Sequence, residues 1–544
     1  MSTDVAAMKD EIEKWEGKDG FSRYLAFMRE AHEHYELSAT HVLLRNFTSI
    51  LAMTRWSFLK HLLALHPFES IYSRAARYFR TERLRRVFTF GSMYMGMNPF
   101  EAPGTYSLLQ YTELAEGIWY PLGGFHKVSK QFYGCATLLT LQVIEALVNV
   151  GERLGVKYRF STAVEKITMS SDNSRATGVL LANGEHLMAD IIINNSDLVY
   201  AYNNLLPPTP YANNLTEREG SCSSISFYWA LDRKIPQLSA HNVFLADEYK
   251  ESFDAIFKRH LIPNEPSFYV NVPSRVDPSA APPDKEAIVI LVPVGNMLDS
   301  GDDKPAPTGT EKKIVTGQQA ANGDPTLLTK DPQKPGLSPS NTQDWEAMVA
   351  LARRTILATI KARTGIDLAP HIVFESSNDP KTWRDRFNLD RGAILGLSHS
   401  FFNVLSFRPS TRARRGGFLD GKFGGGVLGR VAEVLWPGGS IKGLYMVGAS
   451  THPGTGMPIV LAGSKLVAEQ VLEDLGIEFP WRAAWTEGDE RMVGKAGKTG
   501  YAIDTVEQPP LWTTELVVQL LVVVLLLAVL YSVMAQLGLS LSFR

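Results

Sequence analysis

The spacing of apolar residues predicts helices over roughly residues 10–90. Tyr24, Met28 and Tyr35 recur at helical intervals, so they fall on one face. A stripe of this kind is typical of a helix face that packs in a protein core. His32 and His34 are two residues apart and point to different faces of such a helix, and we expect both at the surface.

The middle of the chain changes to the two-residue period of strands. Residues 156–160 alternate apolar and charged side chains, which predicts a half-buried strand. Asn183 and Gly184 then separate two short strands, and this dipeptide suits a two-residue hairpin turn. A short buried strand is predicted at 191–193, and the polar residues 194–197 can cap a following helix.

The strongest local pattern lies between Gly443 and Leu475. Residues 444–447 form a short apolar strand, and the loop 448–457 holds three glycines, where a ligand can approach the backbone closely. Pro458 suits the first turn of the helix that follows. The free amides and positive dipole end of that helix start favour a ligand carrying partial negative charge. Taken alone, the same strand, loop and helix could equally have a structural role.

The end of the chain has a different composition. No charged residue lies between Glu515 and Arg544, and the apolar run 516–539 is long enough to cross a hydrocarbon core of ~30 Å. This run predicts a transmembrane helix over 512–539. Basic residues are more frequent before it than after it, which places the main domain on the cytosolic side.

Charge and cysteine content exclude several classes of protein. The chain has 544 residues with 55 basic and 57 acidic side chains, so no global field favours nucleic acid. Two cysteines, Cys135 and Cys222, cannot build a disulfide framework or a multi-cysteine metal site.

Residues 424–429 match the dinucleotide-binding pattern formally. The stretch before them is FLDGKF instead of an apolar strand, so we reject that match.

Three long segments resemble the signatures of one enzyme family. They are GLYMVGASTHPGTGMPIVLAGSKLVAEQVLEDLG at 443–476, FTFGSMYMGMNPFEAPGTYSLLQYTELAEGIWYPLGGFHKV at 88–128 and NLDRGAILGLSHSFFNVLSFRP at 388–409. Together they resemble the bacterial and fungal phytoene desaturases, which are carotenoid-making flavoenzymes, and the fungal members most closely.

The resemblance implies an α/β (α+β mixed) flavoprotein with a sheet-plus-helices substrate domain and one C-terminal transmembrane helix. Family members begin with a strand, a glycine-rich turn and a helix that bind the ADP half of FAD. This chain opens at the helical part, so we expect an incomplete Rossmann-like domain that binds FAD poorly on its own. The expected divisions are a helical substrate-side region at 1–150, an FAD-binding part at 151–200 and 440–476, a substrate domain at 201–439 with a disordered insertion at 298–342, and a membrane anchor at 512–539.

The resemblance also implies where the cofactor lies. FAD is the implied cofactor, and NAD(P) is an alternative electron acceptor. In relatives a strand like 161–169 passes the adenine, and a loop like 448–458 meets the isoalloxazine. The implied cofactor-binding residues are Val164, Asn195, Gly448, Gly454, Thr455, Gly456, Met457 and Pro458, and no metal is expected.

The implied substrates are phytoene and related carotenes, which are long hydrocarbons. A cofactor must accept the hydride, and a carboxylate could take the proton or stabilise positive charge. Glu116 and Asp385 are the predicted catalytic carboxylates, with Glu113 and Asp390 as further candidates, and an ion pair or a helix cap remains an alternative for each. Five aromatic residues could line an apolar tunnel or simply pack a core: Tyr94, Tyr106, Tyr111, Trp119 and Tyr120.

Three interpretations remain open. The first is a carotenoid desaturase that uses FAD, anchored in a membrane, expected to be the endoplasmic reticulum, and in contact with membrane lipid. The second is a non-catalytic remnant that binds lipid or a partner but not FAD. The third is a member of the amine-oxidase-like flavoproteins acting on a polar substrate, which the apolar signature segments oppose.

Overall fold

The structure is a computed structural model that describes most of residues 1–479. The gaps are residue 2, 48–51, 54–57, 59–60, 63, 121–142, 299–342, 418–419, 421, 423–425 and 436–437. The predicted insertion at 298–342 therefore lies almost wholly outside the described residues.

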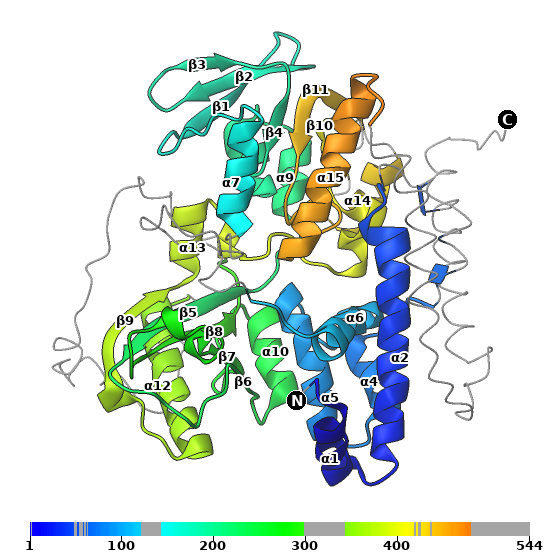
Figure 1. Ribbon diagram of the computed structural model, residues 1–544. Coiled ribbons are helices and arrows are strands. Elements are labelled where there is room, and N and C mark those ends of the chain that lie inside the picture. Colours follow the sequence, from blue (N-terminus) through cyan, green and yellow to red (C-terminus); the bar gives the residue numbers. More distant parts are fainter. Residues whose placement is uncertain are drawn as a thin grey trace.

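The N-terminal part is helical, as the apolar spacing predicts. Its main helices are α1 (Val5–Glu16), α2 (Gly20–Ser38), α4 (Ile71–Tyr78) and α5 (Glu82–Thr89), which pack side by side (Figure 1). Tyr24 and Phe27 are buried between these helices together with Phe79 and Phe88. The 3₁₀ helices η3 (Phe90–Met95) and η4 (Gly104–Ser107), the helix α6 (Leu108–Tyr111), the π-helical turn η5 (Thr112–Glu116) and α7 (Val143–Arg153) follow.

The prediction that His34 lies at the surface is wrong. His34 is fully buried, with Nδ1 2.8 Å from the Ser107 hydroxyl and Nε2 2.9 Å from the Ala64 carbonyl oxygen. Both ring nitrogens therefore have polar partners, which removes the cost of burying them.

A five-stranded antiparallel sheet forms the second part of the fold. Its order is β6 (His241–Phe244), β7 (Phe268–Asn271), β8 (Glu286–Val294), β5 (Ser223–Leu231) and β9 (Ile372–Asn378). The helix α12 (Trp345–Thr364) packs on this sheet through Ile356 and Ile360, which join Phe227, Trp229 and Ile290 in the largest core (Figure 1). The helices α10 (Tyr249–Phe257) and α13 (Pro380–Phe387) lie between this sheet and the other parts.

The third part contains two small sheets. Strands β1 (Val164–Met169), β2 (Ala176–Leu181) and β3 (His186–Met188) form an antiparallel sheet, and the predicted hairpin at Asn183-Gly184 is confirmed between β2 and β3. The predicted strand at 156–160 is wrong, because these residues are exposed and pair with no described strand.

The other small sheet has the order β10 (Arg412–Gly416), β11 (Gly439–Met446) and β4 (Ile192–Asn194). The helix α15 (Met457–Asp474) packs beside it, and α8 (Leu198–Tyr200), α9 (Pro210–Thr216) and α14 (Val427–Leu435) are close by (Figure 1). Asp197 Oδ1 accepts a hydrogen bond of 2.9 Å from the Tyr200 amide, which confirms the predicted helix cap after β4.

The prediction of a single-pass membrane protein is corrected by the helices that the structure describes. None of them is both long enough and apolar enough to cross a bilayer. The longest, α12, carries Arg353, Arg354 and Lys361 within its length, and charges at that depth are costly in lipid. The predicted span at 512–539 lies outside the described residues.

Candidate functional site

The glycine loop between β11 and α15 lies where two parallel strands end. Leu444 pairs with Ile192 and Met446 pairs with Asn194, so both strands reach the same edge of the sheet. Asn195 follows β4 directly, and its Nδ2 donates a hydrogen bond of 2.9 Å to the Val447 carbonyl. The sequence order alone would not place these two segments together, but the parallel pairing does.

Three glycines shape this loop because its backbone needs positive φ. Gly448, Gly454 and Gly456 have φ of 131°, 130° and 106°, a region that other residues rarely adopt. A Cβ on Gly454 would lie 2.7 Å from His399 Nε2, and one on Gly448 would lie 3.0 Å from Asn195 Nδ2. The loop therefore presents bare backbone at the start of α15, where Gly456 offers no side-chain cap.

Arg408 forms hydrogen bonds to backbone carbonyls of this loop. Its guanidinium is buried and donates to the carbonyls of Thr451, at 3.0 Å, and Ala449. His399 Nε2 lies 3.2 Å from Arg408 Nη2 and accepts a hydrogen bond of 3.2 Å from the Thr455 amide. Burial, with the charge of Arg408, lowers the pKa of His399 well below its usual value, so the ring is neutral and Nε2 is an acceptor.

A first cavity, which we call the loop cavity, lies against the start of α15. Its walls come from the π-helical segment η1 (Ala39–Leu43), η4, α6 and the glycine loop. Tyr106, His452, Pro453 and Ile459 lie at the loop side. The rest of the lining is almost entirely aliphatic or aromatic and includes Val42, Leu43, Phe58, Leu62, Leu65, Met95, Leu108, Leu109, Phe401, Val404 and Leu405.

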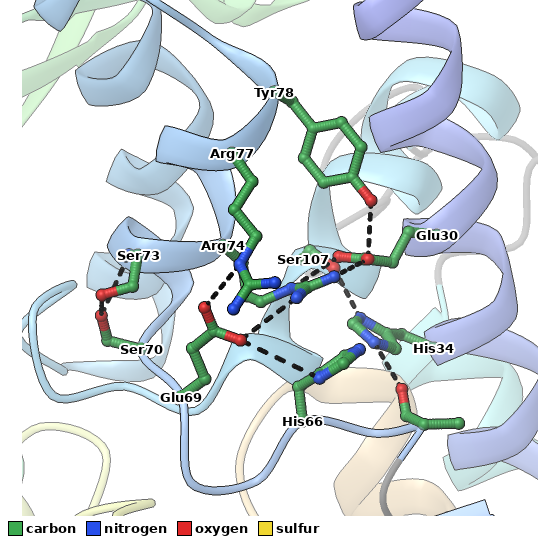
Figure 2. Close-up of polar contacts among 11 residues, drawn as sticks. Glu30, His34, His66, Glu69, Ser70, Ser73, Arg74, Arg77, Tyr78 and Ser107 are labelled. Atoms are coloured by element: carbon green, nitrogen blue, oxygen red, sulfur yellow. Dashed lines mark hydrogen bonds and ion pairs between the residues drawn. The ribbon is translucent and has the colours of Figure 1, made fainter. Parts of the chain in front are cut away.

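Figure 2 shows a buried polar cluster, which we call the Arg74 cluster and which includes Glu30, His34, Glu69, Arg74 and Ser107. Arg74 lies between Glu30 and Glu69, with Nε 3.1 Å from Glu30 Oε1 and Nη1 3.1 Å from Glu69 Oε2. The Glu69 carbonyl accepts a hydrogen bond of 2.7 Å from the Gly104 amide, and His34 bonds Ser107. The cluster therefore fixes both ends of η4, whose Thr105 and Tyr106 line the cavity.

A second cavity of about 420 Å³, which we call the sheet cavity, lies over the five-stranded sheet. Most of its lining is apolar, and Glu113 is the only carboxylate among the described residues that line it. Burial raises the pKa of Glu113 to about 7. Tyr94, Tyr269 and His241 line the same cavity, and His241 Nδ1 is 2.6 Å from the Tyr269 hydroxyl.

The predicted catalytic carboxylates lie away from both cavities. Glu116 is exposed at the end of η5. Asp385 on α13 accepts a hydrogen bond of 2.8 Å from Arg384 and is partly exposed. Asp390 begins a short 3₁₀ turn, and neither cavity includes it. No observation tests their catalytic roles, so these stay predictions.

The structure places the other predicted site residues in two groups. Asn195 and the loop residues Gly448, Gly454, Thr455, Gly456, Met457 and Pro458 come together at the end of the parallel pair. Val164 begins β1 in the separate antiparallel sheet and is partly exposed. Among the aromatic residues, Tyr106 and Tyr94 line the loop and sheet cavities respectively. Tyr111 stacks on His32, while Trp119 and Tyr120 are exposed.

Sequence reasoning did not single out four residues that the structure places at the candidate site: Arg408, His399, Tyr269 and His241. Arg408 and His399 lie in the quoted segment at 388–409, where a buried charge within an apolar stretch is the available signal. Tyr269 and His241 lie on different strands, and only the register of β6 with β7 brings them together.

The fold and site define a mixed α/β protein with a glycine loop at a strand edge and apolar cavities beside it. A scan of protein families finds no matching profile. The phytoene desaturase of Cercospora nicotianae is 58% identical over 518 residues, which cover 94% of this chain and 78% of that protein. The enzyme of the same name from Fusarium fujikuroi is 53% identical over 498 residues, covering 91% and 76%. That of Neurospora crassa is 50% identical over 502 residues, covering 90% and 71%.

These relatives place the chain among the oxidoreductases that act on CH–CH groups. The chain belongs to the phytoene desaturase family. Among solved structures, a redesigned putrescine oxidase matches with 11% identity and a TM-score of 0.44, covering 83% of this chain and 76% of that one.

Proposed function

We propose that this protein removes hydrogen from adjacent carbons of phytoene, with FAD as the hydride acceptor. The product of each step is a carotene with one more carbon–carbon double bond. FAD supplies the hydride-accepting chemistry, because no side chain can accept a hydride. The observation that carries the proposal is the family membership over 94% of the chain, together with an apolar cavity that opens on the glycine loop.

The residues of the glycine loop fit a flavin. The positive φ of Gly448, Gly454 and Gly456 keeps the backbone free of Cβ atoms, as a planar ring against the loop requires. The first amides of α15 and its dipole favour the electron-rich pyrimidine edge of a flavin. Asn195 and the segment from Gly454 to Pro458 would hold this edge.

The loop cavity fits a hydrocarbon better than a polar substrate. The loop cavity offers Tyr106, His399 and His452 among many apolar side chains. The Nε2 atoms of both histidines already have partners, since His452 Nε2 is 2.8 Å from the Arg45 carbonyl oxygen and His399 Nε2 accepts from the Thr455 amide. A charged amine would therefore meet no carboxylate among the described residues that line the loop cavity, whereas a carotene would bury apolar surface.

The test is conversion of phytoene by the purified full chain. Phytoene in detergent micelles is incubated with the protein and either FAD, NAD⁺ or NADP⁺, and the carotenes are separated by chromatography. We expect products with more conjugated double bonds when FAD is present. Conversion that needs NAD(P) instead would overturn the choice of cofactor. Unchanged phytoene, with a flavin spectrum that titrates to one equivalent, would overturn the activity.

A further inference from the structure

Arg408 is a buried cation without a carboxylate partner. Four arginines are buried among the described residues: Arg74, Arg218, Arg408 and Arg414. Three of them each form an ion pair with a glutamate. Arg408, which is 4% exposed, forms none with a described residue, and the charged groups that act on it include no carboxylate. A buried charge of this kind is costly, so its retention calls for a physical reason.

The hydrogen bonds of Arg408 all end on neutral acceptors. Nη1 donates to the carbonyls of Ser398, at 3.0 Å, and Asn403, at 2.7 Å, while Nε and Nη2 donate to carbonyls of the glycine loop. Neutral donors could bind the same carbonyls, so fixing the loop does not in itself require a cation. Burial lowers the pKa of Arg408 to about 10, which leaves the guanidinium charged at pH 7.

This uncompensated charge lies beside the start of α15. His399 Nε2 is 3.2 Å from Arg408 Nη2 and 3.2 Å from the Thr455 amide nitrogen. Arg408 Nη2 is therefore no more than twice that distance from the amide of the residue before the N-cap, Gly456. The helix start and the guanidinium thus contribute positive potential to the same part of the loop.

A charge in this position acts on a ligand at the loop without touching it. At an effective dielectric constant of ~20, two unit charges ~12 Å apart change an equilibrium constant about tenfold. Salt screens buried charges much less than exposed ones. The hydrogen bonds of Arg408 hold the guanidinium in place, so its field at the loop is fixed before any ligand binds.

We propose that the buried charge of Arg408 stabilises the reduced form of FAD at the glycine loop. This inference rests on the proposed function, in which FAD takes a hydride from the substrate. The hydride brings two electrons and one proton to N5 of the neutral ring, so the reduced ring carries one more negative charge, on its pyrimidine part. The substrate loses its second hydrogen as a proton to water. An uncompensated cation favours the reduced form and makes FAD a stronger hydride acceptor.

The experiment examines the bound flavin without phytoene. The full chain is incubated with a saturating concentration of FAD, and the midpoint potential of the bound flavin is measured against a reference dye and compared with that of free FAD. Sulfite is the second probe. It forms a bond to N5 of the oxidised flavin, and the electron pair of that bond leaves an additional negative charge on the ring. Both measurements therefore respond to positive charge near the pyrimidine part.

Four single variants separate the charge from the hydrogen bonds. R408Q removes the charge, and R408K keeps it with fewer donors. N403D keeps Arg408 and exchanges a buried amide for a carboxylate of equal size, in a residue whose carbonyl is 2.7 Å from Arg408 Nη1. R412Q is the matched control, because Arg412 on β10 pairs with Asp474, which ends α15 at the opposite end from the loop. Circular dichroism checks folding.

We expect the wild type, R408K and R412Q to bind reduced FAD more tightly than oxidised FAD, so their potentials should lie above that of free FAD. R408Q and N403D should lose at least about tenfold of this preference, which is ~30 mV for a two-electron couple. Their affinity for sulfite should fall about tenfold as well, because the adduct carries the same additional charge.

The proposal is overturned if the wild-type potential does not exceed that of free FAD, or if folded R408Q or N403D keeps the wild-type potential and sulfite affinity. A loss in R408K or R412Q as large as that in R408Q would also overturn it. N403D retains Arg408, so it decides the question if R408Q does not fold. A wild type that binds no FAD would overturn the proposed function instead.

Discussion

At the residue scale, the conformation of the glycine loop requires residues without a Cβ atom. The φ of 130° at Gly454 lies outside the range of other residues, and a Cβ there would lie 2.7 Å from His399 Nε2. His399 is fixed in turn by buried Arg408, so the ring cannot move away without breaking that contact. The loop conformation is therefore sensitive to a single added methyl group.

We expect G454A to weaken flavin binding at least tenfold and to lower stability by ~1–3 kcal/mol. The matched control is G184A in the β2–β3 turn, where φ is also positive, at 85°, but a Cβ would meet nothing within 4 Å. G184A should bind flavin like the wild type. Flavin titration by fluorescence, with circular dichroism to check folding, measures both. Equal flavin affinity in G454A and the wild type would contradict this account of the loop.

The raised pKa of Glu113 also predicts a pH-dependent stability. The unfolded chain releases this proton near pH ~4.3, whereas the folded protein holds it until about pH 7. The contribution of Glu113 is fully present below the unfolded pKa and is lost as the pH rises through the folded pKa. E113Q has no such titrating group. The free energy of unfolding of E113Q minus that of the wild type should therefore increase when the pH is raised from 5 to 8. Urea unfolding at both pH values measures the change, and an equal difference at both would contradict it.

At the scale of elements, the Arg74 cluster joins α2, α4 and η4. The side chains of Arg74, Glu30 and Glu69 are 7%, 12% and 13% exposed. Loss of the guanidinium would leave the buried Glu30 carboxylate without its cation, whereas Glu69 would keep its ion pair with Arg77 at 3.0 Å. Tyr78 donates to Glu30 at 2.7 Å and would remain (Figure 2). Buried ion pairs are costly to break because the remaining charge is uncompensated.

We expect R74M to lower the free energy of unfolding by ~3–5 kcal/mol. The matched control is R80M, because Arg80 pairs with Asp19 at 3.0 Å but both side chains are mostly exposed, at 70% and 55%. Such surface pairs contribute about 0–1 kcal/mol. Denaturant titration of both variants checks the difference. Similar losses in R74M and R80M would show that the cluster does not support the fold.

Elements with a regular period were predictable, and those set by tertiary contacts were not. The hairpin at Asn183-Gly184, the cap at Asp197 and the helix after Pro458 follow from local chemistry and are confirmed. The alternation at 156–160 predicts a strand, but no described partner strand lies beside it. Local pattern cannot supply a partner, since sheets depend on pairing between distant segments.

The candidate site shows the same limit. Glu113 and Glu116 are three residues apart and would be neighbours on a regular α-helix. They lie instead on the π-helical turn η5, which changes the rotation between them, so that Glu113 faces the sheet cavity and Glu116 faces solvent. The sequence alone identifies Glu113 and Glu116 as candidate carboxylates, but it does not show which of the two faces a cavity.

At the scale of the whole molecule, three parts meet around η3. The helical part contributes η3 and η4, residues of the five-stranded sheet line the sheet cavity, and the small sheet with α15 presents the glycine loop. Segments from residue 38 to residue 459 thus line two adjoining cavities. Only the folded chain therefore places the apolar lining of these cavities beside the glycine loop.

The most direct test of the central claim is a single-turnover reaction without oxygen. The full chain is incubated with a saturating concentration of FAD, phytoene is added, and the flavin absorbance and the carotenes are measured in the same sample. We predict that the oxidised flavin band bleaches and that one new carbon–carbon double bond forms for each flavin reduced. A flavin that stays oxidised, with bound phytoene recovered unchanged, would contradict the account.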